Sequence, residues 1–197
     1  MRCPGFSPAL PALLLLAAAC TLEKQNVPAP APVPRPVADS SPYVCKLVPE
    51  QAFRLVSGLS GPLTEKTNGT ESNGDCRAPD PAPHPLEVWW AREGPGMPRE
   101  HMDFLMNEDR RPLYSRYGGV ALSPDLGDGM AAHVRSAPFT DQPYRVSATF
   151  RCSGRERMID IYLAQVAKGR DAIKDLIALM RIAQKRYGDL YDCTPGA

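Results

Sequence analysis

The sequence predicts an α+β fold, in which a curved antiparallel sheet carries helices packed on it. Two segments that alternate polar and apolar residues, 144–152 and 158–166, flank a Ser-Gly-Arg turn and predict a hairpin of two strands. An apolar stripe with helical spacing follows over about residues 170–187. Cysteines occur before, within and after these segments, which favours two disulfides in an exported chain. We therefore expect one α+β domain over residues 43–197.

Export is predicted by an apolar run near the N-terminus. Residues 10–20 read LPALLLLAAAC, and Arg2 supplies a positive charge ahead of them. The run is shorter than the roughly 20 apolar residues that span a bilayer, but it has the length of the apolar core of a signal peptide. We expect residues 1–19 to be removed as a signal peptide.

Two forms of processing fit this run. The small residues at 17–19 suit ordinary secretion, whereas Leu-Ala-Ala-Ala-Cys resembles a bacterial lipobox, in which Cys20 is lipidated and becomes the new N-terminus. Loss of Cys3 and lipidation of Cys20 would leave an even number of cysteines that can pair fully. We favour the lipobox, which anchors the protein to the outer face of the cell membrane. The alternative is secretion with Cys20 free or joined to a second chain.

Residues 20–42 form the expected lipidated N-terminus and a proline-rich spacer. Frequent prolines between positions 26 and 42 fix φ and remove backbone donors, so neither a helix nor a sheet can form there. Such a segment adopts polyproline II and extends about 3.1 Å per residue. We interpret it as a stalk that holds the domain away from the membrane. A proline-rich ligand for the groove of a partner is the alternative.

The first half of the domain predicts two helices and one strand. Residues 49–59 start with proline, repeat apolar side chains at three-residue spacing and end near glycine, which is typical of a helix. The polar residues 64–76 and the proline-dense residues 77–85 predict turns and loops. Residues 86–92, LEVWWAR, predict a strand, and residues 99–107 predict a short helix.

The second half predicts strands followed by the long helix. Strands are expected at 120–122, 130–135, 144–152 and 158–166, with a turn cluster at 124–129. The helix over 170–187 should bury one stripe against the sheet, made of Ile173, Leu176, Ile177, Met180, Ala183 and Tyr187. Gly188 is expected directly after its last turn.

Four cysteines of the domain allow three pairings. We favour Cys45–Cys76 together with Cys152–Cys193. Each of these bonds closes a loop of some tens of residues and contributes roughly 3–4 kcal/mol in the chain-entropy model. The second bond would hold the terminal helix on the last hairpin.

Trp89 and Trp90 are the first candidates for a binding surface. Adjacent residues of a strand point to opposite faces of a sheet, so one indole is exposed if one face is open. An exposed indole beside Arg92 is able to anchor a sugar, a peptide or a partner protein. If both faces are covered, both rings belong to the core instead.

A basic and aromatic loop is the second candidate. It contains Arg110, Arg111, Tyr114, Arg116 and Tyr117. Such a loop would be suited to an acidic wall polymer, and the alternative is a solvated loop without a partner.

The sequence contains no recognisable pattern for catalysis, a metal or a cofactor. His84, His101 and His133 lie far apart without ligand spacing. Neither a G-x-S-x-G elbow nor a phosphate-binding P-loop occurs, and paired cysteines leave no thiolate nucleophile. The formal net charge of +1 provides no bulk attraction to nucleic acid. We expect no metal, no cofactor and no nucleic-acid partner.

Several features occur together in one known group of proteins. They are the lipobox-like Cys20, the proline-rich spacer, a Cys-Lys-Leu-Val-Pro-Glu entry to a helix, the second cysteine at Cys76, and a Gly-Asp turn before strands that end in Phe-Arg-Cys at Cys152. Together they resemble small actinobacterial secreted lipoproteins of unknown function, whose domain is similar to PsbP-like α/β sandwiches. The resemblance covers most of residues 43–193 and implies no catalytic residue.

Two functions remain open at this point. The first, which we favour, is a non-enzymatic envelope lipoprotein that binds a ligand or a partner, such as an envelope protein or a wall polymer. The second is an extracytoplasmic hydrolase with an unrecognised site. A pocket with two convergent titratable side chains would favour the hydrolase.

Overall fold

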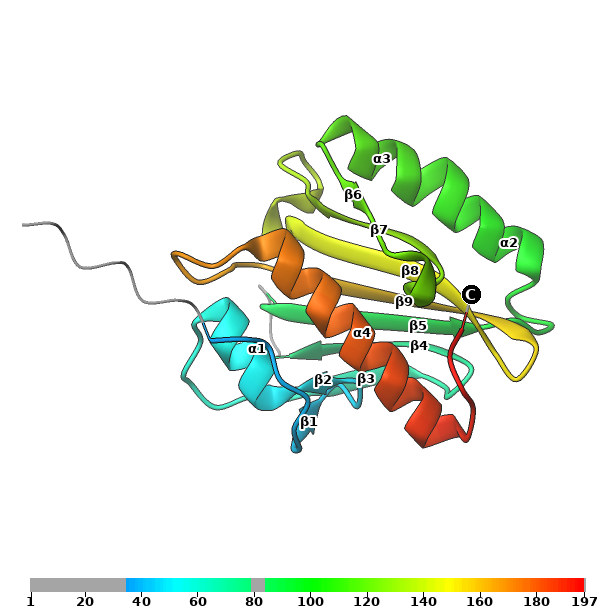
Figure 1. The fold of residues 1–197 in the computed structure, drawn as a ribbon, viewed down its shortest axis with the longest axis horizontal. Helices are drawn as coiled ribbons and strands as arrows, with labels where there is room; N and C mark the ends of the chain where they lie inside the picture. The colour runs from blue at the N-terminus through cyan, green and yellow to red at the C-terminus, as the bar shows by residue number, and fades with distance from the viewer. Residues whose placement is uncertain (1–34, 79–83, 197) are drawn as a thin grey trace, which may run out of the picture. The chain divides into compact units, whose positions relative to one another are not determined.

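A seven-stranded antiparallel sheet forms the centre of the structure (Figure 1). This computed structural model describes residues 35–78 and 84–196. The expected signal peptide at 1–19, Cys20 and the spacer as far as residue 34 lie outside the described residues. The strand order is β3-β4-β5-β9-β8-β7-β6. The strands are β3 Lys66–Gly69, β4 Asn73–Ala78, β5 Leu86–Arg92, β6 Val120–Ala121, β7 Asp128–His133, β8 Tyr144–Cys152 and β9 Arg155–Leu163.

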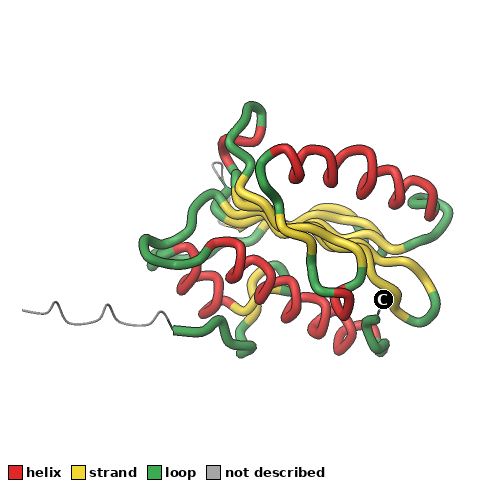
Figure 2. The backbone as a smooth tube through the Cα atoms, turned by 45° about the horizontal axis from the view of Figure 1, so that its top comes forward, coloured by secondary structure: helices red, strands yellow, loops and turns green. Residues whose placement is uncertain are grey.

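Helices lie on both faces of this sheet (Figure 2). One face carries α1 Glu50–Ser57 and α4 Ala172–Tyr191, and the other carries a continuous helical run. That run consists of α2 Arg99–Phe104, a π-helical turn over Leu105–Arg110 and α3 Arg111–Arg116, and we call it the crossing helix. The remaining elements are the short strands β1 Tyr43–Val44 and β2 Val48–Pro49 and the 3-10 turns Pro124–Leu126 and Phe139–Asp141. The predicted α+β class is confirmed.

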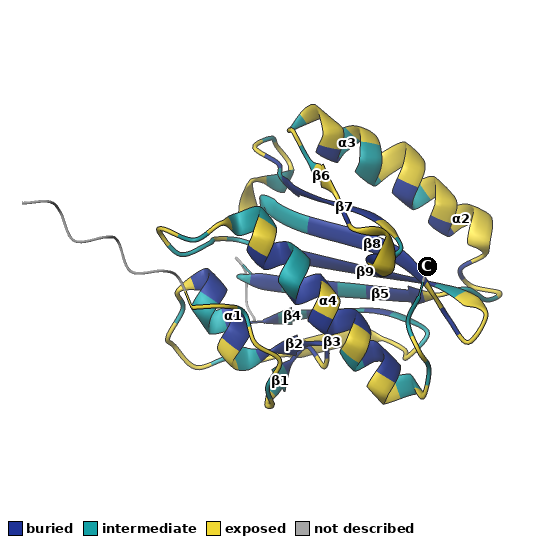
Figure 3. Ribbon diagram, viewed as in Figure 1, coloured by how far each residue is buried: buried dark blue, intermediate teal, exposed yellow. Residues whose placement is uncertain are grey.

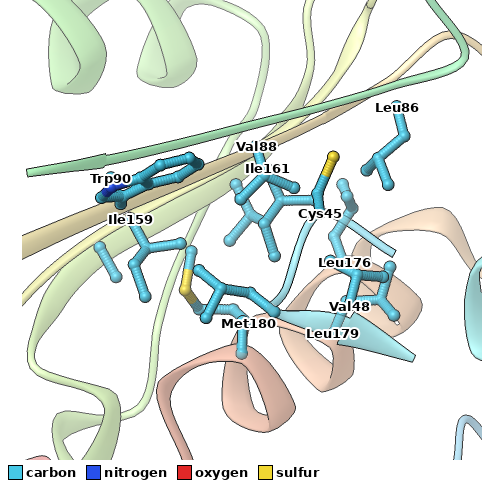
Figure 4. Close-up of a cluster of buried hydrophobic side chains, with 14 of the residues drawn as sticks. Cys45, Val48, Leu86, Val88, Trp90, Ile159, Ile161, Leu176, Leu179 and Met180 are labelled. Carbon is cyan, nitrogen blue, oxygen red and sulfur yellow. The ribbon is translucent and has the colours of Figure 1, made fainter. Parts of the chain in front are cut away.

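The main core lies between the sheet and α4 (Figure 4). Alternate residues of β5 and β9, such as Val88 and Ile161, point to this side and are fully buried. They meet Leu176, Leu179 and Met180 of α4. Complete burial of one such side chain contributes roughly 1.5–3 kcal/mol, so this layer supplies much of the stability of the domain.

Two disulfides hold the ends of the domain on this layer, and both predicted pairings are confirmed in the structure. Cys45–Cys76 joins the turn between β1 and β2 to β4. Cys152–Cys193 joins the end of β8 to the segment after α4. The second bond therefore fastens the C-terminal segment to the strand hairpin, as expected.

The C-terminal helix runs past the residue that was expected to end it. Asp171 caps its start, because its side chain accepts a hydrogen bond from the backbone N–H of Lys174 at 3.1 Å. The prediction that Gly188 follows the last turn is wrong, since α4 continues to Tyr191. A Cβ at Gly188 would lie 2.4 Å from the carbonyl oxygen of Cys193, so the glycine makes room for the returning chain and does not end the helix.

The prediction of a basic, aromatic loop at 110–117 is wrong, because these residues continue the crossing helix as far as Arg116. Proline usually ends a helix, since it lacks an N–H and its ring clashes with the carbonyl four residues earlier. Here Pro112 follows the π-helical turn, whose wider winding removes that conflict with Glu108. The helix predicted from the sequence pattern, over residues 99–107, therefore ends too early.

The polar residues 64–76 form strands where turns were predicted. β3 and β4 make a hairpin in which Asn68 pairs with Asp75. Polar strands of this kind lack the apolar alternation that identifies a half-buried strand. β9 likewise begins three residues earlier than predicted, because Ser153 and Gly154 both adopt positive φ and close a two-residue turn.

The disulfide pattern has a direct test. Digestion of the oxidised protein without reduction should release linked peptides for Cys45–Cys76 and Cys152–Cys193, and a Cys45–Cys193 peptide would contradict the structure. Replacement of both Cys152 and Cys193 with alanine should lower the free energy of unfolding in urea by about 4 kcal/mol, because the bond spans 41 residues.

Candidate binding surface on the sheet

The crossing helix covers only part of its face of the sheet. Met102 and Met106 pack on Met158 of β9, and Tyr114 packs beside Met130 and Ala132 of β7. The helix therefore lies over β9, β8 and β7. On the same side, Ala91 at the end of β5 is buried with these methionines, whereas the other residues of β3, β4 and β5 are partly or fully exposed (Figure 3).

The strand register identifies the side chains of this uncovered region. Residues directly opposite in antiparallel strands share a face, and Asn68, Asp75, Trp89 and Asp160 follow one another across four strands. A parallel row places Lys66, Arg77, Glu87 and Tyr162 side by side. We define the open half-face as Lys66, Asn68, Asp75, Arg77, Glu87 and Trp89.

Polar side chains of the open half-face form a connected network. Asn68 Nδ2 donates to Asp75 Oδ2 at 3.2 Å. The guanidinium of Arg77 lies between two carboxylates, 3.5 Å from Asp75 Oδ2 and 3.6 Å from Glu87 Oε1. Partly exposed pairs of this kind contribute little to stability. Their donors and acceptors remain available to a ligand that approaches the sheet.

The two tryptophans have different surroundings. Trp89 is partly exposed on the open half-face and packs along one side against the methionines under α2. Trp90 is 3% exposed, and its Nε1 donates to the carbonyl of Thr70 at 2.9 Å. A Cβ on the opposing Gly74 would lie 2.7 Å from its ring, so the glycine makes space for the indole.

Of the three candidate residues, only Trp89 lies on the open half-face. Trp90 belongs to the main core, which removes it from the candidate surface. Arg92 is exposed at the end of β5, and its register partner is Arg157. It lines a pocket of about 120 Å³ with Ser72, Asn73 and Arg155 among its neighbours. Trp89 and Arg92, which were predicted to form one surface, therefore lie at two different places.

A buried ion pair fixes the crossing helix beside the open half-face. Asp160 of β9 is 0% exposed, and its Oδ2 lies 3.0 Å from Arg110 Nη2. Burial opposes the charge on Arg110, but the attraction of Asp160, together with that of Tyr162 and Asp109, raises the pKa of the guanidinium. Asp160 Oδ1 and Arg110 Nε have no hydrogen-bond partner among the described residues. The pair therefore depends on a single direct contact.

Two tyrosines border this ion pair. Tyr114 shares a hydrogen bond of 2.8 Å with Ser147 Oγ, and both residues are buried. Burial is the main cause that raises the pKa of Tyr114 and of Tyr162, and the carboxylate of Asp160 adds to it. Both phenols are therefore neutral at physiological pH. Arg145 stacks over Tyr162 at 4.1 Å and closes this side of the cluster.

One group of potential metal ligands occurs in the described part of the chain. It consists of Cys45, Glu65 and Cys76. Both sulfur atoms belong to the disulfide, and Glu65 Oε2 accepts a hydrogen bond from the N–H of Cys45 at 2.8 Å. The role of Glu65 in this arrangement is to cap the backbone beside the disulfide.

No family model, curated protein or solved structure matches the chain.

The buried ion pair generates a stability prediction. Asp160→Asn should lower the free energy of unfolding by about 3 kcal/mol, because it leaves Arg110 charged and poorly paired under the helix. Urea unfolding of wild type and variant measures the difference.

The matched control lies on the same helix. Arg99 and Asp103 form an exposed pair, 3.9 Å apart, so Asp103→Asn should change the free energy of unfolding by less than about 0.5 kcal/mol. Equal losses for Asp160→Asn and Asp103→Asn would contradict the structural role of the buried pair.

Proposed function

We propose that this protein is a cell-envelope lipoprotein whose domain binds a ligand or a partner on the open half-face. The observation that carries the proposal is Trp89, a partly exposed indole on an uncovered part of the sheet. Indole rings supply large contact area at binding surfaces while their edge remains able to donate a hydrogen bond. An envelope protein or a wall polymer is the proposed partner.

The polar network around Trp89 favours binding over hydrolysis. The carboxylates of Asp75 and Glu87 are both held by Arg77. The nearest buried acid, Asp160, is 0% exposed and paired with Arg110, so a substrate on the surface cannot reach it. General acid–base catalysis needs a titratable group within hydrogen-bond reach of the reacting atoms. The described groups instead offer fixed donors and acceptors around an aromatic ring.

An extracytoplasmic location and a lipid anchor on Cys20 are part of the same proposal. Disulfides persist in oxidising compartments, and the structure contains two. None of the helices in the described part of the chain combines the length and apolar character needed to cross a bilayer. Attachment would come from the lipid, with residues 20–42 as the spacer. The resemblance to small actinobacterial lipoproteins supports this arrangement.

The anchor is tested by the variant Cys20→Ser. Two acyl chains hold a protein stably on a membrane, because each buried CH₂ contributes about 0.8 kcal/mol. The variant should therefore move from the membrane fraction to the medium, as followed by immunoblotting of fractionated cells. A variant that remains as membrane-bound as wild type would rule out the lipid anchor.

The open half-face is tested by photo-crosslinking in intact cells. A photoreactive amino acid at position 66, on the open half-face, should give a discrete crosslinked species in native envelopes. The same residue at position 174 serves as the control, since Lys174 is exposed on α4 on the opposite face of the sheet. Trp89→Ala in the first protein should reduce the crosslink yield by about tenfold or more, as expected for a central aromatic contact.

A second variant separates binding from folding in this experiment. Trp89→Ala also removes packing against the methionines, whereas Glu87→Lys alters only the partly exposed network. Both variants should lose the crosslink, and Glu87→Lys should do so while unfolding at urea concentrations near wild type. Identical crosslinks from positions 66 and 174, or a full yield in both variants, would contradict the proposed surface.

A further inference from the structure

Two arginines face each other at one end of the sheet. Arg92 ends β5, and the register places it directly opposite Arg157 of β9. Arg155 starts β9 two residues earlier and points to the same face. Side chains in directly opposite positions have Cβ atoms roughly 4.5–5.5 Å apart, and like charges there repel. This end of the sheet therefore concentrates positive charge.

These arginines form no ion pair with a carboxylate of the described residues. No acidic oxygen among them lies within 4.0 Å of Arg92, Arg155 or Arg157. Arg92 Nη2 donates to Ser72 Oγ at 2.6 Å. Arg157 Nη1 donates to the Glu156 carbonyl at 2.9 Å. The oxygens that accept these two hydrogen bonds are both neutral.

Arg157 is the most buried member of the cluster. It is 6% exposed, and its Nε has no hydrogen-bond partner among the described residues. Burial lowers its pKa, Arg92 and Arg155 lower it further, and a contact with Tyr187 opposes the change. A buried guanidinium without a counter-ion is costly, so an anion bound nearby would stabilise this end of the domain.

A pocket of suitable size adjoins the cluster. It has a volume of about 120 Å³ and is lined by Arg92, Arg155, Ser72, Asn73 and the turn at 93–97. Figure 1 shows this turn beside the hairpin between β8 and β9. The volume equals the share of about four water molecules in the liquid, which suits a small tetrahedral oxyanion.

One carboxylate also lines the pocket. Glu93 contributes to the wall, but its Oε2 accepts the backbone N–H of Glu156 at 2.8 Å. That hydrogen bond ties the carboxylate to the hairpin. The two lining arginines, with Arg157 of β9, leave the region with an excess of positive charge.

We propose that this pocket binds a phosphate-type oxyanion through Arg92 and Arg155. The planar guanidinium group offers paired N–H donors that match the oxygens of a phosphate. The Ser72 hydroxyl, which accepts a hydrogen bond from Arg92, lies in the same wall and adds a neutral donor. Arg157 contributes charge from β9, two residues beyond Arg155.

The pocket lies near the C-terminal end of α4. The carbonyl of Arg35, at the start of the described chain, accepts a hydrogen bond from Arg170 at 3.0 Å, just before α4 begins. Arg92 interacts with Tyr187 and Tyr191 in the last turns of α4. The 20 residues of that helix span about 30 Å, so the pocket lies toward the opposite end of α4 from Arg35.

Calorimetric titration of the full-length Cys20→Ser protein with inorganic phosphate, at constant ionic strength set with chloride, tests the proposal. Saturable binding is expected, and both Arg92→Ala and Arg155→Ala should weaken it by about tenfold or more. Arg92 and Arg155 are exposed, so these variants should fold. Arg116→Ala, at an exposed arginine of α3 outside the pocket wall, should leave the affinity unchanged.

Three outcomes would overturn the proposal. They are the absence of saturable phosphate binding, undiminished binding in the Arg92→Ala/Arg155→Ala double variant, and binding to phosphatidylglycerol vesicles without binding to inorganic phosphate. The titration uses neither the lipid anchor nor Trp89. Failure here would therefore leave the crosslinking result at position 66 intact, and failure of the crosslink would leave the phosphate site intact.

Discussion

The buried ion pair between Asp160 and Arg110 is the interaction on which the layered arrangement depends most. Asp160 lies in β9, near the middle of the sheet, and is fully buried. An unpaired carboxylate there would carry a large desolvation cost, so the strand requires a cation from the helix above it. Arg110, the last residue of the π-helical turn, provides this cation, and its Nη2 lies 3.0 Å from Asp160 Oδ2. We infer that the pair specifies where the crossing helix sits, more than it adds to net stability.

The consequence of that position is a sheet with one closed face and one face that is only partly closed. α1 and α4 cover the first face, and disulfides fasten the segments at both ends of that layer. On the second face the crossing helix lies over β9, β8 and β7. The polar β3–β4 hairpin and the side chains of Glu87 and Trp89 in β5 stay partly or fully exposed. The contact between Asp160 and Arg110, in which Trp89 takes no part, thus determines how far Trp89 is exposed.

Sequence patterns within one segment predicted the strands and the helix whose formation depends mainly on that segment. Strict alternation located β5 and β8 and put Trp89 and Trp90 on opposite faces, and helical spacing located α4. The crossing helix past Pro112 and the polar hairpin at Asn68 were missed, because tertiary contacts override weak or contrary local signals there. Asp160 had a visible signal as the lone carboxylate in the apolar run MIDIYL. Its partner Arg110 lies 50 residues away, and the opposed Arg92 and Arg157 meet only through strand register. No pattern within one segment reveals such pairs.

Fluorescence quenching of two single-tryptophan variants measures most directly whether the crossing helix leaves Trp89 uncovered. The Trp90→Phe protein reports on Trp89 alone, and the Trp89→Phe protein reports on Trp90 alone. Acrylamide and iodide should quench Trp89 readily, whereas Trp90, which is 3% exposed in the main core, should be protected. Equal protection of both indoles, or stronger quenching of Trp90, would contradict the open half-face and the binding function built on it.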